Sequence, residues 1–148
     1  MEKDLKPLLI AIKAEKQAIE YYARAARRVV NETGKEALKK ILKQEETHYK
    51  HLKEKFKKMA GRELKKGEED SQASKISGLT EEHIPDKESS DLEVCQIAIK
   101  DETEANLFYT KAANDTQDEE AKKLYLELAT EETRHAQILQ QICKILSQ

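Results

Sequence analysis

Two residues near the carboxyl end of the chain, Glu132 and His135, could bind a metal ion together. The Glu-x-x-His spacing places both side chains on one face of a helix, one turn apart. They interrupt an apolar stripe that runs from Ala121 to Leu146 at helical spacing, so both are expected to point into a core. Because burying an isolated charge is costly, charged residues in a core are usually paired or bound to a metal.

The same pattern occurs twice, because the sequence contains an internal repeat with a shift of 87 positions, as from Glu45 to Glu132. Each half has a Glu-x-x-His motif on its second predicted helix and another Glu 30 positions earlier, on its first. Four carboxylates and two imidazoles that project inward from four helices form the ligand set of a dimetal carboxylate bundle. The predicted metal ligands are Glu15, Glu45, His48, Glu102, Glu132 and His135.

This ligand set indicates which metals would bind. Two divalent cations would cancel the repulsion among four buried carboxylates. Oxygen ligands with one imidazole per metal suit iron or manganese, with zinc as a substitute. Glu45 and Glu132 are expected to bridge the two ions, and Glu15 and Glu102 to bind one ion each.

Two tyrosines follow the first acid of each half by seven residues, Tyr22 after Glu15 and Tyr109 after Glu102. At that spacing each phenol lies on the same helix face as the acid, two turns away. Each is expected either to donate a hydrogen bond to a ligating carboxylate, as support around the metal, or to be an ordinary core aromatic.

Other acids and histidines fall outside the apolar stripes. Glu20 is off the stripe of its helix and is predicted to be a surface residue, although a rotation of that helix would exchange it with Glu15. Four further residues are predicted to be exposed to solvent: Glu46, His51, His83 and Glu131.

Composition favours an all-α fold. The chain has 148 residues, enough for a single domain with a substantial core, and 38% of them are charged, with only four Gly and two Pro. Such a composition is typical of long helices with solvated outer faces. The formal net charge of −2 gives no indication of nucleic-acid binding. The charged first residues predict neither a signal peptide nor a membrane span, and a cytoplasmic location is expected.

The two cysteines, Cys95 and Cys143, lack the spacing of a zinc or thioredoxin-like motif. Cys95 lies on the apolar stripe of its helix and Cys143 beside the stripe of its own. Both are predicted to be small buried apolar groups rather than reactive thiols.

Four helices are predicted, at residues 4–31, 34–60, 90–114 and 117–146. Capping boxes are expected at Thr33–Glu36, Ser90–Glu93 and Thr116–Glu119. Residues 61–89 are rich in Lys, Glu and Ser and are predicted to be a linker, with a short helical turn after Thr80. So long a connection could run the length of the bundle, or could exchange helices with a neighbouring subunit.

At these motifs the chain resembles the rubrerythrin branch of the ferritin-like diiron superfamily. The matching segments are Glu15-x-x-Ala18 with Tyr22, Glu45-Glu46-Thr47-His48, Glu102-x-x-Ala105 with Tyr109, and Glu132-Thr133-Arg134-His135. The resemblance implies an all-α, ferritin-like four-helix bundle with one long crossover between the second and third helices, built from two repeated hairpins. It also implies a homodimer and a carboxylate-bridged diiron site that reacts with hydrogen peroxide or dioxygen.

Three departures from the family pattern bear on activity. Rubrerythrins have a rubredoxin-like domain with four Cys, which this sequence lacks, so electrons are expected from an external rubredoxin-like or flavoprotein donor. They also have an extra carboxylate where Ala105 stands here, a difference that bears on peroxidase activity. The haem-ligating Met of the similar bacterioferritins falls at Glu46, which argues against haem.

Three functions therefore remain open from the sequence. The chain could be a diiron peroxidase or oxidase, a ferroxidase that handles or stores iron, or a non-catalytic bundle that binds metal.

Overall fold

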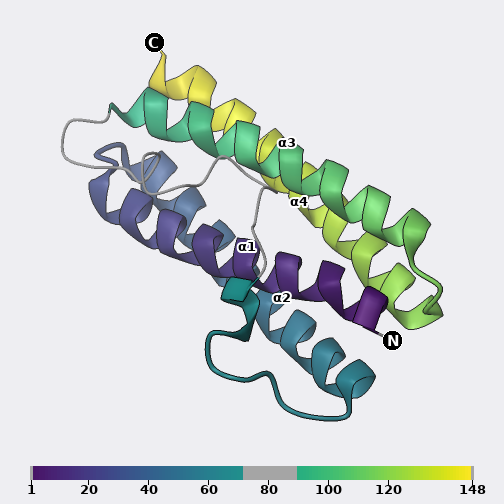
Figure 1. The fold of residues 1–148 in the computed structure, drawn as a ribbon. Helices are drawn as coiled ribbons and strands as arrows, with labels where there is room; N and C mark the ends of the chain where they lie inside the picture. Colours follow the sequence, from purple (N-terminus) through teal and green to yellow (C-terminus); the bar gives the residue numbers. More distant parts are fainter. Residues whose placement is uncertain (1, 72–89, 148) are drawn as a thin grey trace.

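Two antiparallel helical hairpins pack side by side in the computed structural model, which describes residues 2–71 and 90–147 (Figure 1). The first hairpin consists of α1 (Glu2–Arg28) and α2 (Glu32–Ala60), and the second of α3 (Asp91–Asp115) and α4 (Glu119–Leu146). A short 3-10 helix, η1 (Glu68–Ser71), follows α2. The described residues contain no strand, which confirms the prediction of an all-α four-helix bundle.

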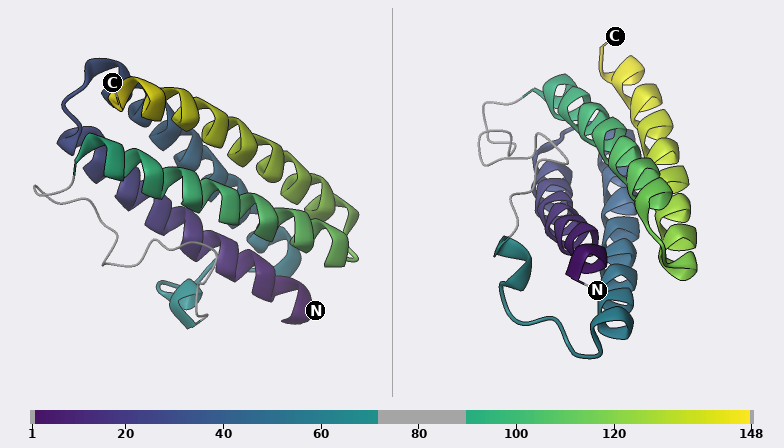
Figure 2. Two further views of the ribbon diagram at one scale, coloured as in Figure 1. Left: turned by 90° about the horizontal axis from the view of Figure 1, so that it is seen from above. Right: turned by 45° about the vertical axis from the view of Figure 1, so that its right-hand side comes forward.

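The start of α3 lies at the opposite end of the bundle from the end of α2. Asp91, at the start of α3, accepts hydrogen bonds from the backbone N–H groups of Val30 and Asn31, in the turn between α1 and α2. At the opposite end, Lys55 near the end of α2 forms an ion pair of 2.9 Å with Asp118, in the turn between α3 and α4. The helices α2 and α3 therefore run parallel, as two views show, and the predicted crossover is confirmed (Figure 2).

The helix ends lie within three residues of the predicted positions, but two of the three predicted capping boxes are wrong. Ser90 caps α3 as predicted, by accepting from the N–H of Glu93. The cap of α2 is Asn31, whose side chain accepts from Gly34, and not Thr33. The cap of α4 is Asp118 and not Thr116. In both turns an Asn or Asp two residues from the predicted Thr provides an equally good acceptor.

The linker region is only partly described. Within it, η1 packs on α1, where Glu69 accepts a hydrogen bond of 3.2 Å from Lys16. The predicted helical turn after Thr80 lies outside the described residues.

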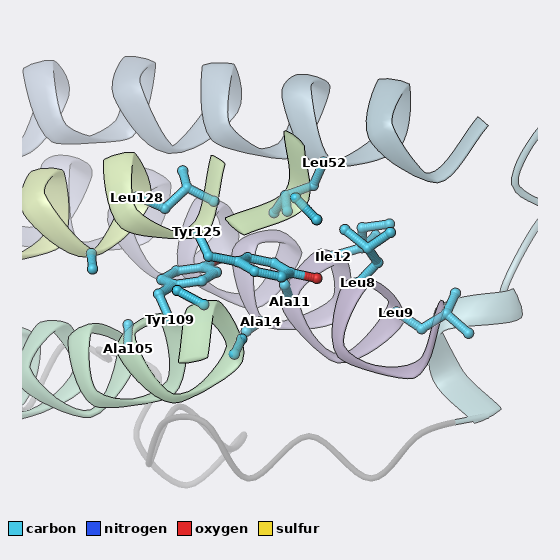
Figure 3. Close-up of a cluster of buried hydrophobic side chains, with 14 of the residues drawn as sticks. Leu8, Leu9, Ala11, Ile12, Ala14, Leu52, Ala105, Tyr109, Tyr125 and Leu128 are labelled. Carbon is cyan, nitrogen blue, oxygen red and sulfur yellow. The ribbon is translucent and has the colours of Figure 1, made fainter. Parts of the chain in front are cut away.

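The core consists of two apolar clusters, one toward each end of the bundle. Cluster 1 contains Leu8, Ile12, Leu52, Phe56, Tyr109, Tyr125 and Leu128 among others. Figure 3 shows the rings of Tyr109 and Tyr125 stacked within it, with centroids 6.2 Å apart. Cluster 2 contains Tyr21, Tyr22, Leu38, Ile41, Cys95, Leu139 and Ile142 among others. Between the two clusters, each helix contributes buried polar residues.

The prediction that both cysteines are small buried groups is confirmed for Cys95, which is 2% exposed, but it missed that Cys95 and Cys143 form a disulfide with Cα atoms 5.8 Å apart. That separation is usual for a disulfide. Cys95 is near the start of α3 and Cys143 near the end of α4, so the antiparallel hairpin brings them to the same level.

Among the described residues, no helix combines the length and the apolar character that crossing a membrane requires.

Candidate metal centre

The structure brings the six predicted ligands together at one level between the two apolar clusters. The helices α1 and α3 contribute one Glu each, and α2 and α4 contribute a Glu and a His each. Every one of the six residues is at most 2% exposed. Their placement follows from the repeat, because each hairpin folds back about a turn midway between its first acid and its Glu-x-x-His motif.

The six residues form two overlapping groups. One group contains Glu15, Glu45, His48 and Glu132, and the other contains Glu45, Glu102, Glu132 and His135. Within each group, one potential ligand atom per residue lies within 4.8 Å of the others. Glu45 and Glu132 belong to both groups, as bridging ligands would.

His48 directs its Nδ1 atom at three carboxylate oxygens. These are Glu45 Oε1 at 3.0 Å, Glu132 Oε1 at 3.1 Å and Glu15 Oε2 at 3.3 Å. None of these four buried atoms has a hydrogen-bond partner. Since an unsatisfied buried polar atom is costly, four that converge on one point fit a bound cation.

His135 has a similar position in the second group. Its Nδ1 atom lies 3.1 Å from Glu102 Oε2, 3.6 Å from Glu45 Oε1 and 3.8 Å from Glu132 Oε1. The two imidazole rings are nearly parallel, with centroids 5.9 Å apart. Each group thus offers one imidazole nitrogen and three carboxylates, a donor set that suits iron or manganese.

The outer nitrogen of each imidazole contacts a residue that the sequence analysis did not identify as part of the site. His48 Nε2 contacts Glu131 Oε2, and His135 Nε2 contacts Gln44 Oε1. Such partners fix the tautomer, so that Nε2 carries the proton and Nδ1 is free to bind a metal. Glu131 was predicted to be solvent-exposed, and its side chain is 43% exposed while its carboxylate also contacts His48. Gln44 and Glu131 occupy corresponding positions in the repeat.

The two tyrosines connect the hairpins. Tyr22 on α1 donates a hydrogen bond of 2.7 Å to Glu102 on α3, and Tyr109 on α3 donates one of 3.1 Å to Glu15 on α1. Each phenol is at most 1% exposed and so is buried with its acceptor. Burial, the neighbouring acids and these hydrogen bonds hold the pKa of both tyrosines well above the usual value, so both remain protonated donors.

Burial also shifts the pKa values of the acids when no cation balances them. Desolvation, together with the charge of Glu45, raises the pKa of Glu15 to about 8 and raises the pKa values of Glu102 and Glu132. Burial acts in the same direction on Glu45, but contacts with His48 outweigh it and lower its pKa. Burial opposes charge on His48, but Glu15 and Glu45 raise its pKa to about 11. The site therefore holds protons that a metal would displace.

Asp101 is a further buried acid, which the sequence analysis did not identify. It is 5% exposed and its Oδ1 atom has no hydrogen-bond partner. Burial and the nearby charge of Glu102 raise its pKa well above the usual value. It belongs to neither ligand group among the described residues.

The structure also places the acids and histidines that were predicted to lie at the surface. Glu20, Glu46 and His51 are exposed, as predicted. His83 lies outside the described residues. Ala105 is 7% exposed and belongs to cluster 1, one turn beyond Glu102.

Comparison with known proteins supports the fold and part of the family resemblance. Residues 93–147, most of the second hairpin, match the family model described as Rubrerythrin. Among solved structures, a hypothetical protein from Pyrococcus furiosus is similar over 96% of this chain and 89% of its own, with a TM-score of 0.72 and 23% identity, which supports the fold alone. No curated protein matches the sequence at a significant level. The predicted resemblance to rubrerythrins is thus confirmed for the hairpin that carries Glu102, Glu132 and His135.

Proposed function

We propose that this chain, whose second hairpin matches the Rubrerythrin family model, is a rubrerythrin-like non-haem diiron protein. Its centre would react with hydrogen peroxide or dioxygen. The main support is the convergence of His48 Nδ1 and three carboxylate oxygens, all buried and without hydrogen-bond partners. The second group, around His135, shares two of those carboxylates.

Each residue of the centre has a proposed role. Glu45 and Glu132 would bridge two ions, while Glu15 and Glu102 would each bind one, with His48 and His135 as the nitrogen ligands. Two ferrous ions would supply two electrons for the reduction of the oxidant. Tyr22 and Tyr109 would hold the terminal carboxylates in position through their hydrogen bonds.

A small oxidant could approach between α2 and α4. A cavity of about 290 Å³ lies there and is lined by His48, Glu131, Arg134 and His51, among others. His48 itself is only 1% exposed, so the cavity reaches the edge of the centre while the ligands remain shielded from bulk water. Shielding of this kind strengthens electrostatic interactions inside a site.

The proposal includes partners. A rubredoxin-type iron site needs four cysteine thiolates, and the sequence has two cysteines, so electrons would come from a separate rubredoxin-like protein or flavoprotein. A homodimer is proposed from the family resemblance. Sedimentation of the iron-loaded protein would measure its oligomeric state. A large closed shell in place of a dimer would favour ferroxidase activity in iron storage.

The experiment that tests the function is oxidation of the ferrous protein. Protein loaded with Fe(II) without oxygen is mixed with hydrogen peroxide or with dioxygen, and the near-ultraviolet absorption of ferric carboxylate is followed. We expect absorption to rise with at least one oxidant, and no rise for a Glu45→Ala variant treated in the same way. If iron binds but neither oxidant changes its absorption, the proposed reaction is ruled out and the chain is a non-catalytic metal-binding bundle.

A further inference from the structure

The disulfide between Cys95 and Cys143 lies close to the candidate metal centre. Cys95 precedes Glu102 by seven residues on α3, and Cys143 follows His135 by eight on α4. These separations correspond to about 10 and 12 Å along the helix axes, at 1.5 Å per residue. Electron transfer through protein weakens steeply with distance, and a separation of this size permits it.

The repeat provides an internal comparison for the disulfide. The positions that correspond to Cys95 and Cys143 in the first hairpin are Leu8 and Phe56, both fully buried in cluster 1. Ordinary apolar packing therefore suffices at the equivalent place in the same fold. The fold does not demand a disulfide there, so the cysteine pair is an addition at one end of the bundle.

A second feature is confined to the same end. Tyr21 donates a hydrogen bond of 2.6 Å to the backbone oxygen of Val94, the residue before Cys95. Its ring meets that of Tyr22 edge to face, with centroids 5.5 Å apart, and Tyr22 donates to Glu102. A continuous path of bonds and contacts thus joins the disulfide to a candidate metal ligand.

Among the described residues, the opposite end of the bundle has no equivalent path. The residue that corresponds to Tyr21 is Phe108, which has no hydroxyl group, and the one that corresponds to Val94 is Pro7. The cysteine pair and the tyrosine hydroxyl therefore occur together at one end of the bundle.

The two cysteines differ in burial. Cys95 is 2% exposed, whereas Cys143 is partly exposed at the edge of cluster 2. Cys143 is therefore the residue of the pair that a reductant in solution would reach first, while Cys95 remains inside, next to the path described above. Exposure of one sulfur is a requirement for thiol exchange.

We propose that Cys95 and Cys143 form a redox-active pair that stores two electrons for the metal centre. The inference rests on the proposed function. The two thiols lose two electrons and two protons as the S–S bond forms. Hydrogen peroxide takes up the same number of each as its O–O bond breaks to give two waters. Iron held by the six ligands would relay these electrons, and a dithiol or a thioredoxin-like protein would restore the thiols by attack on Cys143, becoming a disulfide itself.

The test counts electrons and thiols in a single turnover. The protein is reduced with excess dithiol, freed of reductant without oxygen, loaded with Fe(II) and titrated with hydrogen peroxide. We expect the natural chain to consume twice as much peroxide as a Cys95→Ala/Cys143→Ala variant and to lose both free thiols, counted by mass after alkylation. The single Cys143→Ala variant changes only a partly exposed residue, and it should consume the same amount of peroxide as the double variant.

Two controls separate the possible explanations. Metal-free reduced protein should keep its thiols at the same peroxide concentration, and equally fast loss would mean direct oxidation and overturn the inference. Iron that becomes oxidised while both thiols stay free would also overturn it, but would leave the proposed function intact. Iron that neither hydrogen peroxide nor dioxygen oxidises in any variant would overturn both.

Discussion

Tyr109 and Glu15 belong to different hairpins, yet the phenol of Tyr109 donates a hydrogen bond of 3.1 Å to the carboxylate of Glu15. The repeat provides the reciprocal bond, from Tyr22 to Glu102. Each half of the chain thus orients the terminal acid of the other half. Neither hairpin alone would hold a complete set of oriented ligands, so docking of the hairpins and formation of the centre are coupled.

Replacement of Tyr109 by Phe should weaken metal binding. The change removes the only hydrogen bond that Glu15 accepts from a tyrosine in the described structure, while the ring can still pack in cluster 1. Loss of such a supporting contact typically costs about ten- to a hundredfold in metal affinity. Anaerobic titration with Fe(II) against a chelator measures the change. Tyr49→Phe, which alters a partly buried tyrosine of the same cluster, is the matched control, and equal affinities for the two variants would contradict the role.

Removal of a bridging acid should affect both metal positions. Because Glu45 belongs to both ligand groups, Glu45→Ala is expected to reduce bound iron far more than Glu46→Ala, which changes an exposed neighbour. Glu132→Ala should behave like Glu45→Ala, since the two acids are equivalent in the repeat. The measurement is metal content after loading and gel filtration. The same content in all three variants would disprove the ligand assignment.

The sequence predicted that the six polar side chains would meet in the core, because two constraints coincided. A charged residue on an apolar stripe needs compensation, and the repeat placed such residues at matching positions in both halves. Glu15 and Glu102, far apart along the chain, could therefore be predicted as equivalent positions from periodicity and the repeat together. Helix positions followed from the same periodicity.

Other features depended on geometry that periodicity does not encode. Glu131 precedes a ligand by one residue, so its helix position predicted a solvated side chain, but the carboxylate reaches back to His48. The Cys95–Cys143 pairing depends on the relative height of two helices, and the choice of Asn31 over Thr33 as a cap depends on a turn conformation. In each of these three cases several neighbouring residues could have made the contact, and only the three-dimensional arrangement decides which one does.

The two metal positions should differ in affinity. His48 contacts a carboxylate through Nε2, whereas His135 contacts the neutral amide of Gln44. A carboxylate partner makes an imidazole more basic and a stronger ligand. We therefore expect two-step binding, with the group around His48 filled first, in titrations with Mn(II) followed by electron paramagnetic resonance.

The variants Glu131→Gln and Gln44→Glu test this asymmetry from both sides. Glu131→Gln makes the two partners alike and should merge the two binding steps by weakening the tighter one, by about tenfold or more. Gln44→Glu should merge them by strengthening the weaker one. Unchanged two-step binding in both variants would show that the partner of Nε2 does not set the order.

The stability of the metal-free protein should fall as pH rises, whereas the affinity of the protein for metal should rise. In the metal-free protein the folded-state pKa of Glu15, about 8, is above its ordinary value of 4.5, and that of His48, about 11, is above 6.5. Between pH 6.5 and 8 the folded state therefore holds more protons than the unfolded state, and stability falls as pH rises. A bound metal displaces these protons, so its affinity rises with pH.

The gap in thermal midpoint between Mn(II)-loaded and metal-free protein should accordingly widen from pH 6.5 to 8. The metal-free Glu15→Gln variant cannot titrate at this position, so it should lose less stability between pH 6.5 and 8 than the natural protein. For one proton, the difference between the two proteins is up to about 1.4 kcal/mol per pH unit. A gap that narrows with rising pH would mean that the acids and imidazoles of the centre do not exchange their protons for metal.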